Sequence, residues 1–145
     1  MNEYKIMIVE DNPDDIALIE RALKKNNFRC LLVIKRNGEE ALDYLFRECL
    51  IPDLPHLVIL DLKLPKIDGL EFLKTVRDSE TTGILPVVVL TSSIEQKDLI
   101  ESYRLGANSY IRKPVNFDEF IEIMNLVITY WLRLNIYPPI NTNKI

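Results

Sequence analysis

The stretch LVILDLKLPKIDGLEFL, residues 57–73, decides the fold of this chain. Its first four residues are apolar and do not alternate with polar ones, which is typical of a short strand buried on both faces of a sheet. Asp61 follows that run, and Gly69 comes directly before Leu70 and Leu73, which have helical spacing. The stretch therefore predicts a buried strand, a loop that begins with an acid, and a helix.

The same alternation continues on both sides of this stretch. The other apolar runs that predict strands are residues 4–9, 30–35, 87–90 and 109–111. Helices are predicted after the N-cap residue Asn12, from near Gly38, over 94–105 and over 117–134. Strands that alternate with helices indicate an α/β fold with helices on both faces of a parallel sheet. Five strands in a chain of this length predict the flavodoxin-like (βα)5 sandwich with strand order 2-1-3-4-5.

Composition narrows the class of protein. The chain has 145 residues, 48% of them hydrophobic and 28% charged, which fits one globular domain. Its net charge of −4 argues against a nucleic-acid surface, because phosphate backbones attract clustered Lys and Arg. No apolar run approaches the roughly 20 residues that cross a bilayer, and the amino end does not resemble a signal peptide. The two cysteines lack metal or redox spacing, so we expect a cytoplasmic protein with reduced thiols.

Polar side chains follow four of the predicted strands, at the edge where open parallel sheets bind ligands. These residues are Glu10 and Asp11, Asp61, Thr91, and Lys113 followed by Pro114. One Asp at the end of a strand is usually a turn former, and one Lys-Pro is usually a surface turn. Their joint occurrence at successive strand ends of one sheet edge favours a site instead.

The chemistry of that edge follows from its charges. Three neighbouring carboxylates would raise one another's pKa unless a cation lay among them, and Lys113 and a divalent cation supply that charge. Mg²⁺ suits these hard oxygen ligands. A carboxylate held in this way can act as the nucleophile toward the phosphorus of a phosphodonor. Lysine and metal would then stabilise the phosphoryl oxygens, and the Thr91 hydroxyl could donate to one of them.

Four segments of the sequence resemble those of a known family. The segments IMIVEDNPDD, LVILDLKLPKIDGLEFL, PVVVLTSS and GANSYIRKPV occur in the order and spacing of receiver domains of two-component response regulators. The resemblance covers about residues 4–127. It divides the chain into a receiver domain, residues 1–134, and a carboxyl-terminal tail, residues 135–145.

The resemblance assigns roles to individual residues. It makes Asp61 the phosphoacceptor, and it makes Asp11, Asp61 and the backbone carbonyl of Lys63 direct ligands of Mg²⁺, with Glu10 acting through water. Thr91 becomes the switch hydroxyl, Lys113 the partner of the phosphate, and Tyr110 an aromatic rotamer switch. The Lys113–Pro114 bond is expected to be cis. Lys63 stands at a variable position that is thought to tune dephosphorylation, and Asp68–Gly69 is interpreted as a structural turn.

The output of such a domain would have to be a surface, because few residues follow the receiver core. The last helix has an unusually wide apolar arc: a core stripe of Phe117, Ile121, Met124, Ile128 and Trp131, and a second group of Ile123, Val127, Tyr130 and Leu134. Either the tail, with Ile136, Tyr137 and Ile140, folds back over the second group, or a partner or second copy covers it.

The insertion LFRECLIPDLPH and the extension with Trp131 and YPP resemble single-domain regulators paired with cyanobacterial phytochromes. That resemblance implies a phytochrome-type histidine kinase as partner, and a homodimer through the fourth and fifth helices.

Three other classes of protein would need a different set of residues. A haloacid-dehalogenase-type phosphatase would need a second acid where Lys63 stands. A flavin carrier would need a phosphate loop where the acidic EDNPDD segment lies. A pseudo-receiver, folded but not phosphorylated, would not need the acidic set and Lys113.

Overall fold

The computed structural model describes residues 4–48 and 53–139, and its strands form a single parallel sheet in the order β2-β1-β3-β4-β5. The strands are β1 (Tyr4–Val9), β2 (Cys30–Lys35), β3 (Leu57–Leu60), β4 (Val87–Thr91) and β5 (Ser109–Arg112). The α-helices are α1 (Pro13–Lys25), α2 (Gly38–Asp43), α3 (Gly69–Asp78), α4 (Gln96–Arg104) and α5 (Phe117–Thr129). Short π-helical turns, η1 (Tyr44–Glu48) and η3 (Tyr130–Leu134), extend α2 and α5. The predicted fold and strand order are confirmed.

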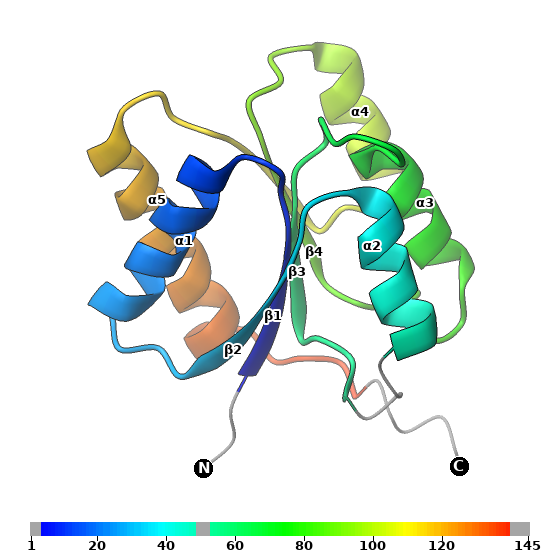
Figure 1. The fold of residues 1–145 in the computed structure, drawn as a ribbon, viewed down its shortest axis with the longest axis horizontal. Coiled ribbons are helices and arrows are strands. Elements are labelled where there is room, and N and C mark those ends of the chain that lie inside the picture. The colour runs from blue at the N-terminus through cyan, green and yellow to red at the C-terminus, as the bar shows by residue number, and fades with distance from the viewer. Residues whose placement is uncertain (1–3, 49–52, 140–145) are drawn as a thin grey trace.

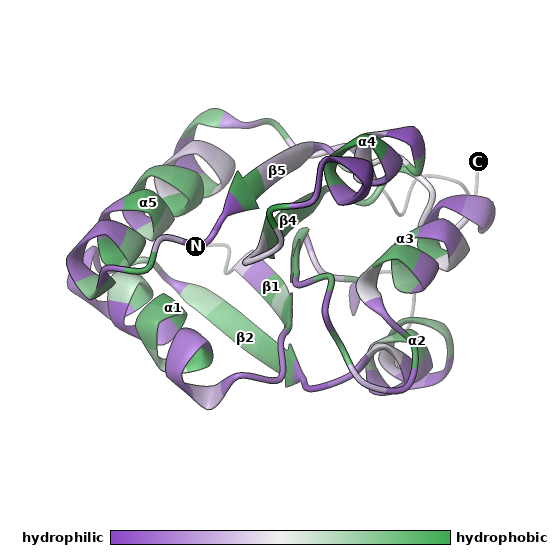
Figure 2. Ribbon diagram, turned by 90° about the horizontal axis from the view of Figure 1, so that it is seen from above, coloured by the Kyte–Doolittle hydropathy of each residue, from purple (hydrophilic) through white to green (hydrophobic). Residues whose placement is uncertain are grey.

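The molecule has three layers. Helices α1 and α5 cover one face of the sheet, and α2, α3 and α4 lie on the other (Figures 1 and 2). A hydrophobic core lies on each face of the sheet, and alternate residues of the central strands point into one core or the other. In β1, for example, Ile6 and Ile8 pack on the side of α1 and α5, whereas Met7 and Val9 pack on the side of α2 and α3. The buried positions of these strands are apolar, apart from Thr91 at the end of β4, because both faces of the sheet are covered.

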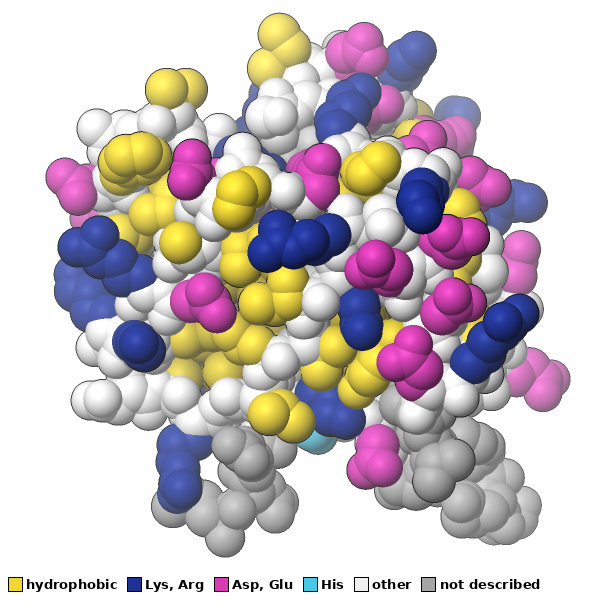
Figure 3. All heavy atoms as spheres, viewed as in Figure 1, with side chains coloured by type: hydrophobic (Ala, Val, Ile, Leu, Met, Phe, Trp, Pro, Cys, Tyr) yellow, Lys and Arg dark blue, Asp and Glu magenta, His cyan; other side chains and the backbone are white. Residues whose placement is uncertain are grey.

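Strand β2 forms an outer edge of the sheet and is more open than the central strands. Leu31 is exposed, and the rest of β2 is only partly buried. Figure 3 shows hydrophobic side chains across the part of this face where Figure 1 places β2. No helix among the described residues is long and apolar enough to cross a membrane.

The helix starts follow the sequence signals. The Asn12 side chain accepts hydrogen bonds from the backbone N–H groups of Asp14 (2.9 Å) and Asp15 (3.3 Å), as expected for the N-cap before Pro13. Asp68 caps α3 in the same way, by accepting from Glu71 N–H at 3.0 Å. These caps fix where each helix begins relative to the strand end before it.

Gly69 brings α3 against the end of β3. A Cβ atom at this position would collide with the backbone carbonyl oxygen of Asp61. Its N–H donates to the carbonyl of Leu62 at 2.9 Å. The Asp68–Gly69 pair is therefore structural, as predicted, and it closes the loop that follows Asp61.

The carboxyl-terminal segment takes an unpredicted route. Residues 135–139 run beneath the sheet at the amino ends of its strands (Figure 1). The ring of Tyr137 lies between those of Tyr4 and His56, at centroid distances of 5.6 Å and 5.2 Å. The described tail does not cover the second apolar group of the last helix, because Tyr130 and Leu134 remain 48% and 70% exposed. Ile140 and Cys49 lie outside the described residues.

The core stripe of the last helix is confirmed only in part. Met124 and Ile128 are buried, and Ile121 and Trp131 pack against the same core. Phe117 was expected there and is 67% exposed, because it is the first residue of α5 and the buried face begins one turn later, at Phe120.

Candidate functional site

Three carboxylates meet at the carboxyl edge of the sheet. Glu10 and Asp11 follow β1, and Asp61 follows β3. The Asp61 backbone N–H donates to the Val9 carbonyl at 3.0 Å, which extends the β1–β3 pairing to the site itself. One carboxylate oxygen from each residue lies within 4.8 Å of the other two. Glu10 and Asp61 are buried and Asp11 is exposed, so the cluster opens to solvent on the Asp11 side.

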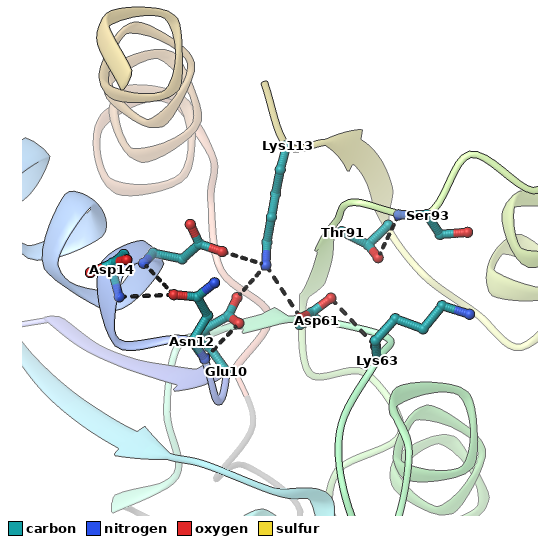
Figure 4. Close-up of polar contacts among 9 residues, drawn as sticks. Glu10, Asn12, Asp14, Asp61, Lys63, Thr91, Ser93 and Lys113 are labelled. Carbon is teal, nitrogen blue, oxygen red and sulfur yellow. Dashed lines mark hydrogen bonds and ion pairs between the residues drawn. The ribbon is translucent and has the colours of Figure 1, made fainter. Parts of the chain in front are cut away.

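Lys113 supplies the positive charge of the cluster. Its ammonium group lies 2.8 Å from Glu10 Oε1, 2.8 Å from Asp15 Oδ2 and 3.2 Å from Asp61 Oδ2 (Figure 4). The Lys113 N–H donates to the Thr91 carbonyl at 2.8 Å, which holds the residue just beyond β5. Burial lowers the pKa of Lys113, but the hydrogen bonds and charges of these carboxylates outweigh burial and raise it, so the side chain is ammonium.

The site disfavours the charged form of Glu10. Burial and, second, the charge of Asp61 raise its pKa to about 7 from an ordinary value of 4.5, although Lys113 and the Asn12 N–H lower it. A cation among the carboxylates would favour the ionised form of Glu10.

The donor set fits a divalent cation. Three carboxylates that converge within bonding reach offer hard oxygen ligands, and the exposed side leaves room for water, as Mg²⁺ and Mn²⁺ require. The loop after Asp61 folds back so that the Lys63 N–H lies 3.4 Å from Asp61 Oδ1. This turn keeps the backbone of Lys63 beside the cluster, and the predicted role of its carbonyl as a ligand stays a prediction.

Thr91 and Tyr110 lie on the two strands beside the acidic cluster. Thr91 is the last residue of β4, is fully buried, and accepts a hydrogen bond from Ser93 N–H at 3.2 Å. The Tyr110 ring packs against the core on the α2 and α3 side, and its buried hydroxyl has no hydrogen-bond partner among the described residues. The roles predicted for both as switch residues stay predictions.

One expectation about Lys113 is wrong. The described chain contains no cis peptide bond, so the Lys113–Pro114 bond is trans. The trans form is the intrinsically preferred state of an X–Pro bond. Here the backbone bond to Thr91 and the three carboxylates orient Lys113 without a cis bond.

Sequence reasoning missed two residues of this edge. Asp15, in the first turn of α1, was not predicted as part of the site, yet it is a partner of Lys113. The available signal was its place in the first turn of the helix that follows Glu10 and Asp11 directly. Asp98, in the first turn of α4, pairs with Lys63 at 3.4 Å and accepts a hydrogen bond from Ser93 at 2.6 Å. No local pattern connects it with residues that precede its helix.

Comparison with known proteins decides the family. Residues 6–125 match the model of the response regulator receiver domain. The chain belongs to this family. It is thus a receiver-domain protein of two-component signalling, as its sequence motifs predicted.

Individual relatives place this receiver more narrowly. The probable methanogenesis regulatory protein FilR2 of Methanothrix harundinacea is 40% identical, over 93% of this chain and 88% of its own. The response regulator Rcp1 of Synechocystis sp. is 34% identical, over 88% of each chain. These relatives are themselves little longer than the receiver, so the resemblance extends over nearly whole proteins.

Solved structures give the same result. The crystal structure of the phosphorylated cyanobacterial phytochrome response regulator RcpA superposes with a TM-score of 0.88 at 38% identity, covering 94% of this receiver and 99% of RcpA. The Mn²⁺-bound form of Rcp1 superposes with a TM-score of 0.87 at 33% identity, covering 93% and 99%. These likenesses confirm the flavodoxin-like receiver fold and its relation to regulators of phytochromes.

Proposed function

We propose that this receiver accepts a phosphoryl group on Asp61 from a phosphohistidine of a sensor histidine kinase. The observation that supports this most directly is the position of Asp61: a buried carboxylate at a strand end, 3.2 Å from the Lys113 ammonium and within the acidic cluster. A carboxylate oxygen of Asp61 attacks phosphorus, and a P–O bond forms as the P–N bond breaks. The electron pair of that bond goes to the imidazole nitrogen, which takes up a proton.

Glu10, Asp11 and Asp61, with the Lys63 carbonyl, would hold a divalent cation, for which we propose Mg²⁺. When bound, such a cation offsets the negative charge that gathers as a phosphoryl group meets a carboxylate. Lys113 lies beside Asp61, which supports a role for its ammonium group as the partner of a phosphoryl oxygen. Thr91, at the end of the neighbouring strand, would donate its hydroxyl proton to another phosphoryl oxygen.

The phosphoryl group would be read out through α4, β5 and α5. In the sheet, Tyr110 pairs with Val89, two residues before Thr91. The hydroxyl of Tyr110 has no partner in the described chain, so no hydrogen bond to described residues opposes a change of its side-chain position. Tyr110 would therefore carry a shift of Thr91 toward the surface formed by α4 and α5.

The partners follow from the relatives and the surface. RcpA and Rcp1 support a phytochrome-type histidine kinase as the phosphodonor. The apolar group on the last helix supports a homodimer through α4 and α5, and the net charge of −4 speaks against nucleic acid as a target. Residues 1–134 would form the receiver, and residues 135–145 its tail. The protein would act as a signalling switch and not as an enzyme that turns over an external substrate.

Incubation with acetyl phosphate and Mg²⁺, followed by intact-mass measurement, tests the proposal. We expect the mass of the wild-type chain to increase by one phosphoryl group, and hydroxylamine to remove it, as it does from acyl phosphates. Asp61→Asn should stay unmodified, whereas Asp43→Asn, which changes a more exposed aspartate on α2, should behave as wild type. A wild-type chain that gains no phosphoryl group would instead support the pseudo-receiver, which acts through interactions alone.

A further inference from the structure

Asp98 connects the loops that follow β3 and β4. Its side chain is only 9% exposed, although it lies in the first turn of α4 at the molecular surface. One oxygen, Oδ2, receives both the Lys63 ammonium at 3.4 Å and the Ser93 hydroxyl at 2.6 Å. These residues stand two positions after Asp61 and Thr91, respectively. A single buried carboxylate therefore connects both sides of the proposed phosphorylation site to α4.

The Lys63 contact holds an ammonium group away from Asp61. The Lys63 backbone N–H lies 3.4 Å from Asp61 Oδ1, but its side chain points away from Asp61 (Figure 4) and ends at Asp98. That side chain is 62% exposed, so solvent weakens the ion pair, and its contribution is small. Its importance is positional: while Lys63 is paired with Asp98, its charge is not available to a group on Asp61.

The Ser93 contact is the stronger of the two. It is short and buried, and its acceptor is ionised. The hydrogen bond from the Ser93 hydroxyl lowers the pKa of Asp98 most, burial opposes this, and the charge of Lys63 lowers the pKa further, so that it stays below its ordinary value. Ser93 Oγ also accepts the Glu95 N–H at 3.2 Å, and Ser93 N–H donates to Thr91 Oγ1 at 3.2 Å. The hydrogen bonds thus run without a break from Asp98 through Ser93 to the hydroxyl of Thr91.

We propose that Asp98 is a positioning residue that holds Ser93, Thr91 and Lys63 in the unphosphorylated arrangement and thereby opposes occupation of Asp61 by a phosphoryl group. The inference rests on the proposed function of Asp61. Ser93 N–H donates to Thr91 Oγ1, and the Ser93 hydroxyl donates to Asp98. A shift of Thr91 Oγ1 toward a phosphoryl oxygen would therefore stretch or break a contact whose donor loop Asp98 holds in place. Lys63 must likewise leave Asp98 before its ammonium can approach the phosphoryl group.

A contact that exists in only one of two conformational states shifts the equilibrium toward that state. By linkage, it weakens the binding of any ligand that favours the other state. Loss of the Asp98 contacts should therefore strengthen binding of a phosphoryl mimic. For contacts of this size we expect about threefold to tenfold tighter binding.

Beryllofluoride, in the presence of Mg²⁺, is a suitable probe because it coordinates a carboxylate oxygen reversibly and needs no phosphodonor. We expect Asp98→Asn, which retains the shape of the side chain and loses its charge, to lower the apparent dissociation constant for beryllofluoride by about threefold to tenfold. Ser93→Ala removes the hydroxyl between Asp98 and Thr91, so it should act in the same direction. The affinity gain of the double variant should exceed that of the better single variant only slightly, because both substitutions act on the same contact between Asp98 and Ser93. Glu101→Gln, one turn further along α4, is the matched control and should bind as wild type.

Amide hydrogen exchange, followed by NMR without any phosphoryl mimic, tests the contact itself. In Asp98→Asn the N–H groups of Ser93 and Glu95 should exchange at least about threefold faster, while those of the central strands stay protected. Two results in Asp98→Asn would overturn the inference but leave the proposed function intact. One is unchanged amide exchange of Ser93 and Glu95. The other is beryllofluoride binding that is unchanged or weaker, while the wild-type chain binds beryllofluoride normally. A wild-type chain that binds no beryllofluoride would overturn the proposed function and the inference with it.

Discussion

The Lys113 ammonium group lies 3.2 Å from Asp61 Oδ2, and both side chains are at least nine-tenths buried. Lys113 also pairs with Glu10 and Asp15 at 2.8 Å each, so one cation offsets the charge of three carboxylates that come from β1, α1 and β3. We expect Lys113 to contribute to folding and, under the proposed function, to phosphoryl transfer, and the two contributions can be measured separately.

Replacement of this lysine should destabilise the metal-free protein. Lys113→Met leaves Glu10 and Asp61 buried without their cation, which should lower the free energy of unfolding by about 3 kcal/mol in urea titrations with chelator present. Mg²⁺ should restore part of the loss, because the cation then offsets the same carboxylates. Even with Mg²⁺ present to stabilise it, Lys113→Met should be phosphorylated by acetyl phosphate far less than the wild-type chain. Lys66→Met, at a lysine whose side chain is 61% exposed, should change neither quantity, and equal losses in both variants would contradict this role of Lys113.

Cation binding should depend on pH through Glu10. Its pKa is raised to about 7, so below that pH the metal-free site holds a proton on Glu10 that a cation must displace. Affinity for Mg²⁺ should therefore be nearly constant above pH 8 and should fall as the pH is lowered, by up to about tenfold at pH 6. Calorimetric titration with Mg²⁺ at several pH values measures this change. Glu10→Gln, which cannot be protonated in this range, should bind more weakly at pH 8 and show a flatter profile, whereas an identical slope in both proteins would rule out Glu10 as the titrating group.

Much of the fold and of the site could be predicted because the signals are local. The strands lie within one residue of the predicted runs. The signal is clearest for β3 and β4, because a segment buried on both faces must be almost wholly apolar. The convergence of Glu10, Asp61 and Lys113 follows from topology, because in a parallel sheet all strand ends of one kind meet at one edge.

The remaining features depend on contacts that no local pattern encodes. The contacts of Asp98 join loops that are distant in sequence. The regular α-helix ends at Thr129, where η3 begins, so the fully buried residue of that segment is Leu132. A continuous helical wheel placed only Trp131 there, which packs against the core but is partly buried. The path of the tail is set by the contacts of the Tyr137 ring with Tyr4 and His56, which are both distant from Tyr137 in the sequence.

The tail should add to stability through Tyr137. Tyr137→Ala removes a partly buried ring from between Tyr4 and His56 and should cost about 2 kcal/mol in urea unfolding followed by Trp131 fluorescence. Ile136→Ala, next in the chain but 91% exposed, should cost almost nothing. Tyr137→Phe should be neutral or stabilising, because the buried hydroxyl has no hydrogen-bond partner among the described residues. A tail that lies free in solution would make all three variants equal to wild type.

The last helix should govern self-association. Tyr130 and Leu134 remain 48% and 70% exposed because the described tail runs elsewhere, and Tyr130 borders a hollow that Val127 and Trp131 also line. If a second copy covers this surface, Tyr130→Asp combined with Leu134→Asp would bury two uncompensated carboxylates in the interface, while the isolated subunit keeps its core. We expect the mass in solution, measured by light scattering across a concentration series, to fall from dimer to monomer in this variant. Ile84→Asp, at a 59% exposed apolar residue between α3 and β4, should remain dimeric. A wild-type chain that is monomeric at every concentration, with or without beryllofluoride, would show that this surface serves a different partner.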